Sequence, residues 1–145
     1  MFTLRPRRDG AELAFGDARV TAVTLADQFR IALTDADRDT ARIALLGAFE
    51  ARVPGGDPWQ LDWRRHDDDR LGRLAFALHE AWLTWCRASE RGVLTMVFEN
   101  GVTLTAPPGP DDDGWELTHE RFRIAGGAGG TLIREEHPGS PAPVW

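Results

Sequence analysis

Asp35, Asp37 and Asp39 stand at alternate positions in the segment TDADRDT, the spacing with which a calcium-binding loop opens. The rest of that loop pattern is absent. Thr40 occupies the position that requires a glycine for the sharp bend, and Leu46 occupies the position of the bidentate glutamate. We therefore predict a loop of solvated carboxylates between two strands in place of a calcium site.

His66, His119 and His137 each stand beside a carboxylate in the sequence, a pairing that acid–base catalysis or metal binding can use. Metal-ligating histidines on a helix recur at i and i+4 or in the pattern H-E-x-x-H, and the chain contains neither. His79, on the predicted helix, has Leu83 four positions later. We interpret the histidines as surface or capping residues and expect no catalytic residue, no metal and no cofactor.

Trp59 and Trp63 are the most suggestive side chains for binding, because they flank the segment WQLDW directly before two arginines. This segment shows no regular pattern. Indole rings beside guanidinium groups are typical of the residues that dominate the energy of a protein interface. The simpler interpretation is that both rings cover the open end of a sheet as an extension of the core.

A second candidate contact surface is acidic and consists of Asp111, Asp112 and Asp113 with the adjoining Trp115. Clustered carboxylates suit arginines or lysines of a partner, although a loop tip that simply stays in water is the simpler alternative. Together with the two tryptophans above, these residues form the predicted partner-binding site.

Composition excludes several chemistries. All 17 basic residues are arginine, and tyrosine is absent. Without lysine the chain cannot form a Schiff base or supply the lysine of a phosphate-binding P-loop, and without tyrosine it has no phenol for acid catalysis. Cys86 is the only cysteine, which excludes an intrachain disulfide and a zinc site of several thiolates. Because its neighbours include Trp82 and Trp85, we predict that Cys86 is a buried core residue.

The net charge of −6 weighs against a nucleic-acid-binding role, because neutralising phosphates requires a clustered basic face. It favours a protein partner with a basic surface. No apolar run approaches the roughly 18 residues of a membrane span, and the N-terminal segment MFTLRPRRDG lacks the apolar stretch of a secretory signal. We therefore expect a cytoplasmic protein that binds neither nucleic acid nor membrane.

Alternating apolar and polar residues predict strands over residues 20–25, 29–33, 41–46, 48–53, 82–88, 121–124 and 131–134. One helix interrupts them, because the apolar residues from Leu71 to Leu78 recur on one helical face. The aspartates 67–69 stand where they would cap its N-terminus. The apolar stripe could extend the helix to Trp85, but a strand from Trp82 is the interpretation we prefer.

The stretch from Val93 to Leu117 predicts a β-hairpin followed by an acidic loop and a further strand, Trp-Glu-Leu. Asn100-Gly101 separates two β-rich runs, and this dipeptide favours a two-residue type I′ turn with positive φ at both positions. The glycine cluster from Gly126 to Gly130 lies between two short strands instead of before a helix. It therefore predicts another hairpin turn and not a phosphate loop.

These elements predict an α+β fold: an antiparallel meander sheet, curved or closing into an open barrel, with one central helix. The length of 145 residues suits one domain, which we place at residues 1–137. Residues 138–145 form a tail rich in proline and glycine. A homodimer formed through a free strand edge is compatible with this arrangement.

The order strand, Asn-Gly, strand, proline-containing acidic stretch, Trp-Glu-Leu and glycine pair resembles an uncharacterised family of small β-rich domains from high-GC bacteria. The resemblance covers roughly residues 20–133 and rests on Asn100-Gly101, Trp115 to Leu117 and Gly129-Gly130. It implies a shared fold and no activity. The chain departs from the pattern in lacking an aromatic residue in the acidic stretch before Trp115.

Two functions are compatible with the sequence. The first is a non-enzymatic protein-binding domain, immunity-like or an accessory partner protein, which small size and acidic charge favour. The second is a small-molecule-binding or catalytic domain that uses the concave face of the sheet, where His119, Arg121 or Glu116 would converge on a pocket.

Overall fold

The computed structural model describes residues 1–65 and 67–136, which contain 13 strands and one helix. All strand pairs are antiparallel. The predicted C-terminal tail, residues 138–145, lies outside the described residues, as do His66 and His137.

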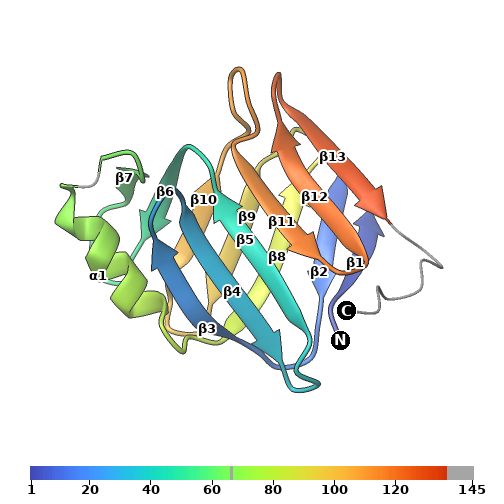
Figure 1. The fold of residues 1–145 in the computed structure, drawn as a ribbon, viewed down its shortest axis with the longest axis horizontal. Coiled ribbons are helices and arrows are strands. Elements are labelled where there is room, and N and C mark those ends of the chain that lie inside the picture. Colours follow the sequence, from blue (N-terminus) through green and yellow to red (C-terminus); the bar gives the residue numbers. More distant parts are fainter. Residues whose placement is uncertain (66, 137–145) are drawn as a thin grey trace.

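The strands form two sheets. Sheet A contains, in spatial order, β1 (Thr3–Arg7), β2 (Gly10–Ala14), β8 (Leu83–Ser89), β9 (Leu94–Phe98), β10 (Thr103–Ala106), β6 (Ala48–Arg52) and β7 (Trp59–Asp62). Sheet B contains β13 (Thr131–Glu136), β12 (Phe122–Gly127), β11 (Trp115–His119), β5 (Thr40–Leu45), β4 (Phe29–Asp35) and β3 (Ala18–Leu25). Figure 1 shows sheet B lying in front of sheet A.

A β-rich chain with a single helix is what the sequence predicted, but the strands are divided between two sheets instead of one curved sheet. Short meanders such as β3–β4–β5 and β8–β9–β10 are present, and the chain crosses between the sheets after β2, β5 and β10. The described strands close no barrel. The physical reason is that each set of strands has one apolar face, and two such faces exclude water by covering each other.

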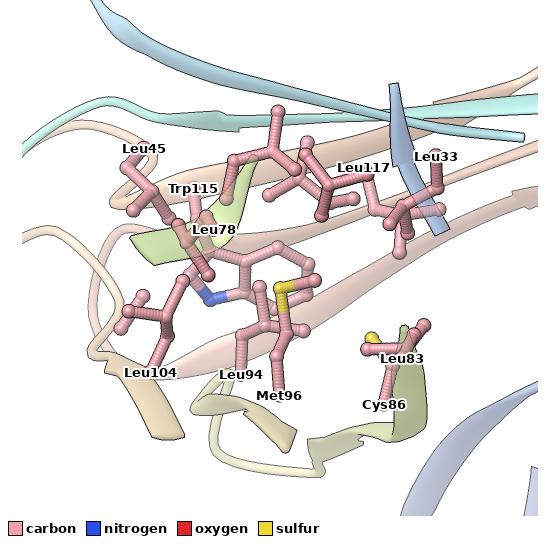
Figure 2. Close-up of a cluster of buried hydrophobic side chains, with 14 of the residues drawn as sticks. Leu33, Leu45, Leu78, Leu83, Cys86, Leu94, Met96, Leu104, Trp115 and Leu117 are labelled. Atoms are coloured by element: carbon pink, nitrogen blue, oxygen red, sulfur yellow. The ribbon is translucent and has the colours of Figure 1, made fainter. Parts of the chain in front are cut away.

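The core fills the space between the sheets. Leu33, Leu45 and Leu117 project from sheet B toward Met96 and Leu104 of sheet A, and each of them is 2% exposed or less. Figure 2 shows these side chains together with Trp115. Because alternate residues of β4, β5 and β11 are committed to this core, the residues between them must face solvent on the outer side of sheet B.

Helix α1 (Asp69–Leu78) closes one side of the sandwich. Its N-cap is Asp68, whose carboxylate accepts the backbone N–H of Arg70 at 3.0 Å, as predicted for this run of aspartates. Leu71, Leu74 and Leu78 are buried. The helix lies against β3 at the edge of sheet B, and the Arg70 guanidinium donates to the Gln60 carbonyl of β7, at the edge of sheet A.

The helix ends at Leu78 and does not continue to Trp85. Trp82 instead forms an isolated bridge with Arg19, and β8 begins at Leu83. The choice between a longer helix and a strand, which the sequence left open, is thereby decided in favour of the strand. The segment around Trp59, predicted to be irregular, is also a strand, because β7 pairs with β6 over residues 59–62.

The turn between β9 and β10 differs from the predicted two-residue type. Glu99, Asn100 and Gly101 form the loop, the Gly101 N–H donates to the Phe98 carbonyl at 3.0 Å, and only Gly101 has a positive φ, of 91°. This is the three-residue hairpin in which a glycine follows a type I turn. The Asn100 side chain accepts the Val102 N–H instead of supporting a positive φ.

The glycines from Gly126 to Gly130, predicted to form one turn, have two different structural roles. Gly126 and Gly127 belong to β12, whereas Gly129 and Gly130, with φ of 80° and 82°, make the turn. A Cβ on Gly126 would collide with the Gly92 carbonyl and with the Trp115 indole. Gly126 is therefore required for close packing of Trp115, a reason that the sequence did not reveal.

Within the described residues, no helix has the length and apolarity needed to cross a bilayer.

Candidate functional site

Two neighbouring rows of outward side chains lie in the middle of the outer face of sheet B. The first row, in the order β3, β4, β5 and β11, is Ala22, Ala32, Arg42 and Thr118. The second row, in the same order, is Thr24, Arg30, Ala44 and Glu116. Three alanines thus stand among longer polar side chains, so the middle of this face is lower than its surroundings.

A β-bulge is responsible for the outward position of Ala22. The register of β3 against β4 shifts between Val20 and Ala22, with Thr21 as the extra residue. Val20 is buried, and in an unbroken strand the residue two positions later would point to the same side. The bulge reverses this phase, so Ala22 joins the outer face and Val23 turns toward the core.

A hollow of about 510 Å³ lies over these rows and is lined by all eight residues together with Gln28. Two of the charged groups at this face are held by neighbours. The Arg30 Nε donates to the Gln28 Oε1 at 3.1 Å, and the Arg123 Nη2 donates to the Glu116 Oε2 at 2.8 Å. Arg42 is exposed, and no hydrogen bond or ion pair to its guanidinium occurs among the described residues.

Two further hollows adjoin the first one because they share lining residues with it. A smaller one, of about 240 Å³, lies between the β3–β4 turn and the start of α1 and shares Gln28. A third one, of about 510 Å³, lies at the start of β5 and the end of β11 and shares Arg42 and Thr118. The three form a track from the helix across sheet B to the β4–β5 loop, over the face that Figure 1 presents.

The β4–β5 loop is organised around the carboxylate of Asp35. The sequence predicted that this carboxylate is solvated, but it is buried. Its Oδ1 accepts the backbone N–H groups of Asp37 and Asp39 at 2.9 and 3.0 Å, and its Oδ2 forms an ion pair with the Met1 ammonium. Burial acts to raise the pKa of Asp35, but the ammonium and these N–H groups hold it below the ordinary value. The carboxylate thus serves to order the loop.

Inside this loop Arg38 has a left-handed backbone with a φ of 63°, and its side chain lines the third hollow. No described residue forms a hydrogen bond or ion pair with the Arg38 side chain. The ordered loop therefore presents a second exposed guanidinium at the same end of the track as Arg42.

His119 lines the third hollow, but its partner is Asp39 and not the neighbouring Glu120. The Nε2 lies 2.8 Å from the Asp39 Oδ2, and the Nδ1 accepts the backbone N–H of Arg121 at 3.1 Å. Only 2% of the His119 side chain is exposed, and its ring stacks on Phe122 at 4.7 Å between centroids. Because both ring nitrogens are used within the fold, His119 positions the ends of β5 and β11.

Asp39 completes this arrangement by accepting the backbone N–H of Phe2 at 2.9 Å. Burial acts to raise the pKa of Asp39, and the bonds to Phe2 and His119 hold it below the ordinary value. Among the described residues no group of three or more metal-ligating side chains converges here or elsewhere.

Trp115, predicted to contact a partner, is a core residue. It has no exposed surface, and its Nε1 donates to the Gly92 carbonyl at 2.7 Å. A side chain with no exposed surface cannot contact a partner in this conformation, so this part of the prediction was wrong. The alternation of β11 explains the error, because Trp115 and Leu117 point inward while Glu116 points outward.

The other predicted partner-binding residues lie in two separate places. Trp59 and Trp63 are half-buried and pack against the core beside α1, the covering position that the simpler interpretation proposed. Asp111, Asp112 and Asp113 lie in the loop between β10 and β11. Asp111 and Asp112 are exposed, whereas Asp113 is half-buried and pairs with Arg123 at 3.2 Å.

That ion pair places the acidic loop at the rim of the outer face of sheet B, because Arg123 also holds Glu116, which lines the first hollow. The fold therefore brings the acidic loop to the same face as Arg42, although not to the tryptophans. Glu116 is the one residue of the predicted concave-face pocket that lines the first hollow.

A comparison with models of protein families shows which family the chain belongs to. The family model of DUF6188, described as a family of unknown function, matches residues 11–134. The chain belongs to this family. The matched range of the DUF6188 domain begins in β2 and ends in β13, so it includes every strand of the outer face described above. The predicted resemblance to an uncharacterised family is confirmed.

Comparisons with curated proteins and with solved structures returned no significant match.

Apart from Glu116, the residues of the first hollow were not singled out from the sequence. A signal was present, because alanines alternate with core residues in β4 and β5 at positions where long polar side chains are usual for a solvent face. What was missing was the register, which sets Ala32 beside Ala22 and places Ala44 one row away.

Proposed function

We propose that this DUF6188 domain is a non-enzymatic protein-binding domain whose contact surface is the outer face of sheet B. The observation that carries the proposal is the track of three neighbouring hollows, in which the first hollow shares Gln28 with the second and shares Arg42 and Thr118 with the third. A rigid sheet with a lowered middle offers a partner a preformed surface, so little conformational freedom is lost on association.

The chemistry of the face supports recognition more than reaction. It offers threonine hydroxyls, two guanidinium groups and a carboxylate around small apolar side chains, a mixture common at non-obligate interfaces. His119 and Asp39, which border this face, form hydrogen bonds with each other and with backbone N–H groups. This proposal includes an immunity-like role, in which the domain covers part of the partner's surface.

The acidic loop belongs to the same proposal as a rim contact. Asp111 and Asp112 are exposed beside the ion pair of Asp113 with Arg123, so they would meet basic groups at the edge of the bound partner. Rim charges chiefly affect the rate of association and its dependence on salt.

A small-molecule ligand is the second candidate, and the size of the first hollow favours it. Its volume of about 510 Å³ falls within the range of pockets that hold small ligands. A protein partner accounts better for the extension of the track beyond this hollow at both ends, toward α1 and toward the β4–β5 loop.

The test fills the floor of the first hollow with Ala32→Arg and uses Thr103→Arg as the matched control. Thr103 lies on β10 and faces solvent from sheet A, so the control adds the same group to the opposite face. Tagged wild-type protein and both variants are used for affinity capture from the source cells with quantitative mass spectrometry. Circular dichroism establishes that each variant is folded.

We expect the wild type and Thr103→Arg to capture the same partner protein in equal amounts. Ala32→Arg should not capture it. Equal recovery with all three proteins, or no specific protein with any of them, contradicts the proposal. A small molecule released on denaturation from wild type but not from Ala32→Arg would favour the second candidate instead.

A further inference from the structure

Arg42 differs from Arg30 and Arg123, two other guanidinium groups of the outer face. Arg30 is bound by Gln28 at 3.1 Å and by Asp27 at 3.3 Å, and Arg123 is bound by Glu116 and Asp113. Arg42 lines the first and the third hollow, is exposed, and has no such partner among the described residues. It is therefore a guanidinium that a ligand can engage without first breaking an internal ion pair.

The charge of the first hollow is positive, which contrasts with the net charge of −6 of the whole chain. Its lining has Arg30, Arg42 and one carboxylate, Glu116. Asp27 pairs with Arg30 and Arg123 pairs with Glu116, which leaves the Arg42 guanidinium as the unpaired charge of this lining among the described residues. Arg38 adds another guanidinium at the far end of the track. An anionic group is thus the complement that the middle of this face requires.

The third hollow also contains two carboxylates. That of Asp39 is engaged by the Phe2 N–H and the His119 ring, whereas Glu120 is exposed. A carboxylate of a ligand would therefore be drawn to the Arg42 side of this hollow, away from Glu120.

The shape of the track indicates the form of the ligand. It runs from Gln28, before the start of β4, to the loop after β4, and this strand has 7 residues. At about 3.3 Å per residue the strand spans roughly 23 Å, which is the length of an extended peptide of similar residue number. The alanine floor leaves room for the main chain of such a peptide to approach the sheet closely.

We propose that the outer face of sheet B binds an extended segment of the partner with an acidic side chain, whose carboxylate pairs with the guanidinium of Arg42. This inference rests on the proposed function and specifies the chemistry of the partner. A planar guanidinium matches a carboxylate through two parallel hydrogen bonds, so the pair sets the register of the segment as well as contributing affinity.

The test uses three pools of fluorescently labelled decapeptides with random flanking positions and a central Glu, Gln or Lys. Binding to the full-length protein is measured by fluorescence anisotropy at two salt concentrations. The informative variant is Arg42→Gln, which keeps much of the side-chain length and removes the charge. The matched control is Arg52→Gln, because Arg52 is also exposed and also without a partner among the described residues, but lies on β6 in sheet A.

We expect the Glu pool to bind wild type and Arg52→Gln alike and to bind Arg42→Gln about ten-fold or more weakly, the usual effect of losing a charge-assisted bond. The Gln and Lys pools should bind weakly to all three proteins. Added salt should weaken the binding of the Glu pool to wild type more than its binding to Arg42→Gln.

Equal binding of the three pools, or equal binding of the Glu pool to wild type and Arg42→Gln, contradicts the proposal that the bound segment is acidic. So does the absence of any peptide binding. In each of these cases the wider proposal stands if Ala32→Arg still loses the captured protein. If Ala32→Arg retains that protein, the outer face itself is not the contact surface.

Discussion

Trp115 of sheet B donates a hydrogen bond from its indole Nε1 to the carbonyl of Gly92, in the turn between two strands of sheet A, at 2.7 Å. Both residues are buried. The bond joins the two layers at the end of the core, and Gly126 leaves the space through which the indole reaches that carbonyl. The tryptophan that the sequence suggested as a partner contact is thus a link between the sheets.

Replacing Trp115 with Phe should lower the free energy of unfolding by about 1–3 kcal/mol, because the buried Gly92 carbonyl loses its donor. Urea unfolding followed by far-UV circular dichroism measures this change. Trp85→Phe is the control, since Trp85 is half-buried beneath the Arg87 guanidinium, 4.7 Å from its ring, and should cost about 1 kcal/mol or less. Equal losses in the two variants would contradict the role of the interlayer bond.

Asn100 connects the β9–β10 turn to the end of α1. Its Nδ2 donates to the Ala77 carbonyl at 2.8 Å, while its Oδ1 accepts the Val102 N–H at 3.1 Å. Asn100→Asp keeps the acceptor, removes the donor and adds a negative charge near the negative end of the helix dipole. We expect a loss of about 1 kcal/mol in urea unfolding.

Glu99→Gln, an exposed substitution in the same turn, is the control for Asn100→Asp and should leave the urea midpoint unchanged. If Asn100→Asp is as stable as this control, the bond to Ala77 does not contribute to holding the helix.

Asp68 should make the stability of the protein sensitive to acid. The Arg70 guanidinium lowers the pKa of Asp68 from 3.8 to about 2. A carboxylate whose pKa is lower in the folded state stabilises the fold at pH values above its ordinary pKa, and this contribution disappears as the pH falls through the folded value. Asp68→Asn retains an N-cap acceptor but cannot titrate.

Thermal unfolding of wild type and Asp68→Asn from pH 6 to pH 2 checks this prediction. Wild type should be the more stable protein at pH 6, and the difference should shrink between pH 4 and pH 2. A difference that is constant over this range would show that Asp68 acts only as a cap.

Cys86 should be unreactive in the folded protein. It is 1% exposed, and burial raises the pKa of its thiol to about 12, so almost no thiolate is present at neutral pH. A coloured disulfide reagent should label one thiol per chain in urea and react in buffer only at the rate of unfolding. Rapid labelling of the folded protein would contradict the buried position of Cys86.

The local elements of this protein could be predicted because their causes are local. The apolar stripe from Leu71 to Leu78 and the aspartate before it determine a helix with a side-chain cap, whatever the helix packs against. The alternation in β4 and β5 determines which residues are buried in those strands. The turn around Asn100 was located correctly, but its type depended on the additional residue Glu99 in the loop.

The candidate site could not be predicted, because it depends on residues that are distant in the chain. Thr118 reaches Arg42 only because β11 pairs with β5, and Ala22 reaches the outer face only because a bulge reverses the phase of β3. Similarly, Asp39 was predicted to be solvated, yet it binds His119, 80 positions away.

By itself, therefore, the sequence determined the class of the protein, its family, the position of its helix and most of its strands, since side-chain periodicity and capping act over a few residues. The tertiary structure alone decided that the strands form two facing sheets, that Trp115 is a core residue, and that Arg42 stands over a floor of alanines. These features arise from strand pairing and layer packing, in which the identity of each neighbour depends on the rest of the chain.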